Sequence, residues 1–165
     1  MKRLFILALV IFLLCSCSQE ATLPKERIAA ASGRFSETLG AMSIYDSDAR
    51  EGEAGYIDGD MIAAMLGEGS YPGEMSGVEE YSIICSQGMR IGEVWMLRCR
   101  TYSSARCVYE LFEKRKKLIT SPEYEDVRDE AAARGTVLLR EGKYVYFAVC
   151  ENGAQIVGFL SGRDV

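Results

Sequence analysis

Histidine does not occur in the 165 residues of the sequence. Its absence removes the side chain that most often serves as a general base near neutral pH, and also the commonest metal ligand. Ser-His-Asp and Cys-His catalytic arrangements cannot be assembled from such a chain, and histidine-ligated zinc is excluded as well. The sequence also lacks the GxxxxGK[ST] pattern of a phosphate-binding loop. Several large classes of enzyme are therefore excluded.

Concentrated positive charge is also missing. The chain has 19 Lys and Arg against 24 Asp and Glu, which gives a net charge of −5. Because binding to a nucleic acid backbone needs clustered positive charge, we expect no nucleic acid partner. The hydrophobic content of 48% is that of a globular protein, and the length is sufficient for one domain with a real core.

The N-terminal segment has the features of a lipoprotein signal. Lys2 and Arg3 precede an unbroken apolar run over residues 4–14. This run is shorter than the roughly 20 residues of a membrane span, but it has the length of a signal-peptide core. The sequence Leu-Cys-Ser-Cys that follows, ending at Cys17, resembles the bacterial lipobox. The resemblance implies transfer of a diacylglyceryl group to the Cys17 thiol and cleavage after Ser16.

These features divide the chain into three parts. Residues 1–16 are the predicted signal peptide, residues 17–23 a lipidated tether, and residues 24–165 a single domain. The predicted location is the extracytoplasmic face of a cell membrane, and the host could be Gram-positive or Gram-negative. An ordinary cleaved signal and an N-terminal membrane helix are the alternatives.

The first part of the domain predicts a helix followed by an irregular region. Pro24 suits the first position of a helix, and Gly40 would stop it. Its expected apolar stripe consists of Ile28, Ala31, Phe35 and Leu39. Residues 41–77 are rich in Gly, Asp, Glu and Ser, and only residues 58–66 suggest a short helix.

The second half of the chain predicts two hairpins separated by helices. Residues 81–85 and 92–100 are expected to form the first hairpin, and residues 136–140 and 143–150 the second. The last apolar stretch, residues 156–160, is predicted as a short edge strand.

Two helices are expected between the hairpins. The first is capped by Ser103 or Ser104 and has an apolar stripe. A second helix should start at Ser121-Pro122-Glu123 and end near Gly135. The expected stripe of the first consists of Ala105, Val108, Leu111, Phe112 and Leu118.

Together these elements predict an α+β fold. Its antiparallel sheet is built from the two hairpins in the order ββ-α-α-ββ, with helices packed on one face and the N-terminal helix before it. The basic run at residues 114–117 is interpreted as a solvated helix end, with a contact to anionic lipid as the alternative.

Part of the chain resembles a known family. The stretch 75–150 is similar to domain of unknown function 4358, a family of mainly Gram-positive bacterial lipoproteins. The resemblance implies a membrane-anchored surface protein and a shared fold, and it supplies no activity. It is carried by Val78-Glu79-Glu80-Tyr81, Glu93-Val94-Trp95-Met96-Leu97, the basic helix at 104–118 and Gly142-Lys143-Tyr144-Val145.

Four cysteines remain after Cys17, and an even number in an exported protein raises the possibility of two disulfides. A hairpin that turns near Gly88 puts Cys99 more than about 20 Å from Cys85, at roughly 3.3 Å per residue. A bridge needs Cα atoms within about 7 Å, so that pairing is not expected. Cys107 and Cys150 have the pattern of buried small residues, and we favour free thiols. No cysteine pair after Cys17 has zinc-finger spacing.

Acidic and aromatic clusters are the remaining candidates for a site. Asp46-Ser47-Asp48 and Asp58-Gly59-Asp60 faintly resemble calcium loops, but an EF-hand from Asp46 would need glycine and glutamate where the chain has Glu51 and Ile57. We interpret these acids as solvated loop residues. The aromatic residues at strand spacing are expected in the core: Tyr81, Trp95, Tyr144 and Tyr146.

The functional hypothesis is a membrane-anchored, non-catalytic binding or accessory module at the cell envelope. The alternative is an extracytoplasmic hydrolase that uses carboxylates alone. No catalytic residue, cofactor or metal ligand is predicted, and Cys17 is the one assigned site residue. The membrane and envelope proteins are the expected partners. Residues 46–77 are the expected contact region, and residues 46–53 are expected to be removable without loss of the fold.

The lipid anchor can be tested directly. We expect the full chain, expressed in bacteria with a labelled fatty acid, to incorporate the label through Cys17. The Cys17→Ala variant should carry none, because the acceptor thiol is gone. Label that persists in Cys17→Ala would contradict the prediction.

Overall fold

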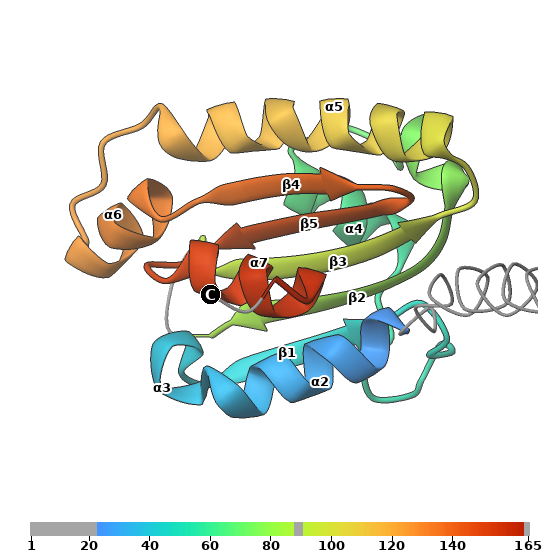
Figure 1. The fold of residues 1–165 in the computed structure, drawn as a ribbon. Coiled ribbons are helices and arrows are strands. Elements are labelled where there is room, and N and C mark those ends of the chain that lie inside the picture. Colours follow the sequence, from blue (N-terminus) through green and yellow to red (C-terminus); the bar gives the residue numbers. More distant parts are fainter. Residues whose placement is uncertain (1–22, 88–90, 164–165) are drawn as a thin grey trace, which may run out of the picture.

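The computed structural model describes residues 23–87 and 91–163. The predicted signal peptide and Cys17 lie outside this part of the chain. The described elements form one sheet with helices packed around it (Figure 1). In chain order they are α2 (Pro24–Arg34), α3 (Ser36–Leu39), β1 (Met42–Asp46), α4 (Gly59–Leu66), the 3-10 turn η1 (Gly73–Gly77), β2 (Val78–Ser86), β3 (Glu93–Cys99), α5 (Tyr102–Thr120), α6 (Val127–Arg134), β4 (Val137–Glu141), β5 (Tyr144–Val149) and α7 (Gly153–Ser161).

The sheet has five strands in the order β1-β2-β3-β5-β4, and every neighbouring pair is antiparallel. The two predicted hairpins, β2–β3 and β4–β5, are therefore confirmed, and β3 joins them by pairing with β5. The α+β fold class is confirmed as well. The strand β1 was not predicted, because its five residues have no clear alternation of apolar and polar side chains.

One face of the sheet packs against α5, and we call it the α5 face. The helix buries Val108, Leu111 and Phe112 against the strands. The Phe112 ring lies edge-on to Trp95 at 5.2 Å between centroids and 5.1 Å from Phe147. Aromatic pairs of this geometry contribute about 0.5–1.5 kcal/mol beyond the area that they bury.

The opposite face is covered by α2 and α7, and we call it the α2/α7 face (Figure 1). Ile28 of α2 and Ile156 and Leu160 of α7 are buried against Val94 and Ala148 of the sheet. The prediction that helices pack on one face only is therefore wrong. The reason is that β3 and β5 are apolar on both sides, so both faces need cover.

The predicted C-terminal edge strand is also wrong, because these residues form α7. Residues 156, 157 and 160 are buried at helical spacing. The helix ends at Gly162, whose φ of 74° is the left-handed conformation that glycine adopts most easily. The β-branched residues suggested a strand, but the apolar sheet surface favours an amphipathic helix.

The two middle helices begin elsewhere than predicted. The N-cap of α5 is Thr101, whose hydroxyl accepts a hydrogen bond from the Ser104 backbone N–H at 3.0 Å. The N-cap of α6 is Asp126 rather than Ser121, and its carboxylate accepts from the Arg128 N–H at 2.8 Å. The α5 stripe is confirmed except at its end, where Ile119 is buried and Leu118 is 55% exposed.

Residues 41–77 are more ordered than predicted. The helix at 58–66 is confirmed as α4, with Asp58 as its N-cap. Asp46 accepts a hydrogen bond from the Ser82 hydroxyl at 2.5 Å, and the Ser47 hydroxyl accepts one from the Tyr81 N–H at 3.1 Å. Deleting residues 46–53 would remove these contacts with β2, and the prediction that the fold survives the deletion stays a prediction.

The four described cysteines are free thiols. Cys85 pairs with Glu93 and Cys99 with Val78 in the β2–β3 register, so they lie at opposite ends of the hairpin as predicted. Cys99 and Cys150 are buried, whereas Cys107 is exposed on α5, contrary to prediction.

Two glycines allow a close approach between the end of α6 and the start of α7. A Cβ atom at Gly135 would lie 2.2 Å from the Cys150 carbonyl oxygen, and one at Gly153 would lie 2.2 Å from the Gly135 carbonyl oxygen. Backbone atoms cannot yield as a flexible side chain can. This contact therefore requires glycine on both sides.

The Gly135→Ala variant should accordingly lower the free energy of unfolding by about 1–3 kcal/mol, because the backbone must shift. Gly33 in α2 is the matched control, since a Cβ there meets nothing within 4 Å. Gly33→Ala should raise the free energy of unfolding by about 0.5–1 kcal/mol through better helix propensity. Urea unfolding of both variants measures this, and equal stability would contradict the close contact.

Candidate functional site

On the α2/α7 face, the strands change from apolar to polar along their length. In β3, Val94 and Met96 are buried, whereas the next residue on this face is Arg98. The register places the polar ends of four strands side by side, and we call them the polar row. It consists of Glu80, Arg98, Tyr144 and Glu141.

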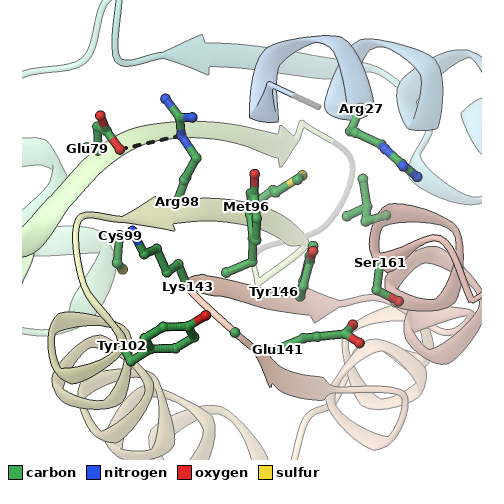
Figure 2. A pocket seen from close by; sticks show the side chains of 13 residues that line it. Arg27, Glu79, Met96, Arg98, Cys99, Tyr102, Glu141, Lys143, Tyr146 and Ser161 are labelled. Carbon is green, nitrogen blue, oxygen red and sulfur yellow. Dashed lines mark ion pairs between the residues drawn. The ribbon is translucent and has the colours of Figure 1, made fainter. Parts of the chain in front are cut away.

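A groove of about 520 Å³ lies along the polar row. Its floor includes Met96, Arg98 and Tyr146 of the sheet, and its sides come from α2, α7, the start of α5 and the β4–β5 turn. Figure 2 shows these side chains converging from elements far apart in the sequence. The volume lies within the range of about 300–1,000 Å³ that is typical of small-molecule sites.

Arg98 is held by two neighbouring carboxylates. Its Nη2 donates to Glu80 at 2.8 Å, and its Nε lies 3.7 Å from a carboxylate oxygen of Glu79 (Figure 2). Within the described residues, the buried Arg98 Nε and Glu80 Oε2 have no hydrogen-bond partner. Buried polar atoms are rarely left without one. This end of the groove therefore keeps unused hydrogen-bonding capacity.

Two cations of the groove make no ion pair within the described part of the chain. Arg27 donates from Nη1 to the Phe159 carbonyl oxygen at 3.1 Å, which leaves its other N–H groups available. Lys143 is exposed on the β4–β5 turn. The acids of the groove are paired, because Glu79 faces Arg98 and Glu141 contacts Arg163 at 3.1 Å. The groove is thus locally cationic although the chain is acidic overall.

Tyrosine rings supply the rest of the surface. Tyr144 and Tyr146 lie nearly parallel, with centroids 6.1 Å apart and planes 18° apart. Burial raises the pKa of Tyr146 to about 12, so its hydroxyl stays protonated at neutral pH. Tyr102, 65% exposed, stands at the rim. The aromatic residues predicted for the core are divided. Trp95 and Tyr146 are buried there, Tyr146 also bordering the groove, whereas Tyr81 and Tyr144 are only partly buried.

A second polar cluster lies on the α5 face. Glu93 is 4% exposed and accepts hydrogen bonds from Trp95 Nε1 at 2.8 Å and from Arg115 Nε at 3.0 Å. Burial raises the pKa of Glu93, and Arg115 opposes this shift. The prediction that residues 114–117 form a solvated helix end is therefore wrong for Arg115, which joins α5 to the sheet.

The cysteines are poorly suited to nucleophilic chemistry. Burial raises the thiol pKa of Cys85 and Cys150 to about 12 and that of Cys99 to about 11. The reactive species of cysteine is the thiolate, which is therefore scarce at these positions near neutral pH.

The acidic clusters have local roles. Asp58 caps α4, while Asp46 and Asp48 face Lys25 at 4.0 and 3.0 Å. Within residues 23–87 and 91–163, no three acidic or cysteine side chains are arranged to hold a metal ion. None of the helices in this part of the chain has the length and apolar character needed to cross a bilayer.

The groove was missed at the level of the sequence. The available signal was a change from apolar to polar among the alternate residues that share one face of a strand, as from Val94 and Met96 to Arg98. This change indicates a site only when the strand register places the polar residues of several strands at the same end of one face.

The chain matches no family model, no curated protein sequence and no solved structure. The resemblance to domain of unknown function 4358 therefore stays a prediction.

The buried Glu93–Arg115 pair generates a test of stability. Arg115→Met should lower the free energy of unfolding by on the order of 3 kcal/mol at neutral pH, because a buried carboxylate loses its partner. A carboxyl group whose pKa is raised in the folded state loses stability as the pH rises through that pKa. The deficit of Arg115→Met should therefore shrink as the pH is lowered.

Urea unfolding over a pH series measures this effect. The double variant Glu93→Gln, Arg115→Met is the control, since it removes both charges and should be less destabilised at neutral pH. A deficit of Arg115→Met that does not change with pH would contradict the assignment.

Proposed function

We propose that this protein is a membrane-anchored extracytoplasmic lipoprotein that acts as a non-catalytic binding module, with the groove as its binding site. One observation carries the proposal: the polar row is left open where α2 begins and α7 ends, and it is bordered by two cations, Arg27 and Lys143, that make no ion pair within the described residues. Apolar strand faces elsewhere in the domain are covered, so the open end is distinct.

The position of the groove agrees with anchoring. Arg27 lies one helical turn after Pro24, where the predicted tether enters the domain. Seven extended residues, 17–23, reach at most about 25 Å. A groove at this end would be held near the membrane surface, where anchoring raises its effective concentration toward envelope components.

The groove favours binding over hydrolysis. Its carboxylates, Glu79 and Glu141, are each engaged in an ion pair with an arginine. Among the described glutamates, Glu93 alone is deeply buried, but it lies on the other face of the sheet and is engaged by Trp95 and Arg115. No specific observation favours the carboxylate hydrolase.

Site-specific photocrosslinking tests the site. A benzoylphenylalanine at position 102, on the groove rim, should form adducts with a membrane or envelope component in intact cells. The same residue at position 127 is the control, because Val127 is 76% exposed at the start of α6, away from the groove.

Equal adducts at both positions, or none at position 102, would contradict the binding site. Turnover of a glycan or peptide substrate by the purified full chain, abolished by Glu141→Gln, would contradict the non-catalytic function.

A further inference from the structure

The two cations that make no ion pair within the described residues, Arg27 and Lys143, lie at different ends of the groove. Arg27 lies at the α7 end, close enough to Gly162 that a Cβ there would be 3.7 Å from its guanidinium nitrogens. Lys143 lies at the other end, on the side of Arg98 and Glu79 (Figure 2). Compensating both charges therefore requires a ligand with two separate negative groups rather than one compact anion.

The surface between these cations is amphipathic. Its floor contains Met96 and Tyr146, which are only 2% and 5% exposed, and its accessible aromatic surface comes from the half-buried Tyr144 and from Tyr102 at the rim. Tyrosine offers an apolar ring face together with a hydroxyl that can donate or accept. An exposed tyrosine surface suits the ring of a sugar, which has apolar C–H faces and hydroxyls at its edge.

The carboxylates of the groove provide hydrogen-bond acceptors. Glu79 is exposed and Glu141 lies at the groove edge beside Tyr144, so both can accept hydrogen bonds from ligand hydroxyls. These acids disfavour a flat anionic bilayer, which would meet them together with the cations. They favour a ligand that carries hydroxyls as well as acidic groups.

We propose that the groove binds an acidic oligosaccharide, with one acidic group at Arg27, another at Lys143, and a sugar ring between them on Tyr144. The inference rests on the proposed binding function and adds the ligand class to it. Each contact between a cation and an acidic group is a charge-assisted hydrogen bond, the stronger kind in proteins.

Titration calorimetry with the full chain in non-ionic detergent tests the ligand class. Trigalacturonate should bind at least about tenfold more tightly than galacturonate, because only the trimer has more than one carboxylate to pair with the two cations. Neutral maltotriose should bind more weakly than trigalacturonate by at least about the same factor. Equal affinity for maltotriose and trigalacturonate would overturn the acidic class.

Charge-removing variants test the placement. Lys143→Gln and Arg27→Gln should each weaken trigalacturonate binding by about tenfold or more. Lys117→Gln removes an exposed cation near the far end of α5 and should leave the affinity unchanged. Lys143 is exposed on a turn, so its variant keeps the test valid if Arg27→Gln fails to fold.

Unchanged affinity in Lys143→Gln would overturn the placement. The failure of this inference is distinguishable from failure of the proposed function. Adducts at position 102 without trigalacturonate binding would overturn only the ligand class, whereas the absence of both would overturn the binding site as well.

Discussion

The antiparallel pairing of β3 with β5 is the interaction on which the rest of the structure depends. It joins two hairpins into one sheet and places apolar residues of both strands on both faces. The 19 residues of α5 run along one face, but α7 has only nine. Nine helical residues span about 14 Å, whereas the nine residues of β2 extend about 30 Å. The α2/α7 face is therefore covered over part of its length only.

This geometric mismatch accounts for the polar row. Where helices end, the strands must present side chains compatible with water, and Arg98 and Glu80 do so. A pair whose side chains are 22% and 32% exposed contributes only about 0–1 kcal/mol to stability. The polar row therefore permits folding but contributes little to the stability of the fold. Stability therefore places little constraint on its residues, which is compatible with the proposed binding function.

The sequence allowed prediction wherever a pattern was local. Alternation identified the hairpins, and helical spacing identified the stripe of α5 from Ala105 to Phe112. Prediction failed where distant surfaces decided the outcome. Residues 156–160 have strand-forming side chains, yet the apolar face of β5 stabilises them as a helix. The groove depends on the register of four strands, and no single segment of the sequence contains that information.

Two arginine–glutamate pairs on β3 illustrate how the same residue types acquire different roles. Glu93 is enclosed, and Trp95 and Arg115 satisfy both of its oxygens, so the pair fixes α5 against the sheet. Arg98 lies near the other end of the strand on the opposite face, and its Nε and one oxygen of Glu80 lack hydrogen-bond partners within the described residues. A closed pair can only stabilise, whereas the pair beside the groove keeps hydrogen-bonding capacity that the described residues do not use. Because Arg98 and Glu80 lie at the end of the sheet where α2 begins, the proposed binding groove is close to the point where the predicted membrane tether enters the domain.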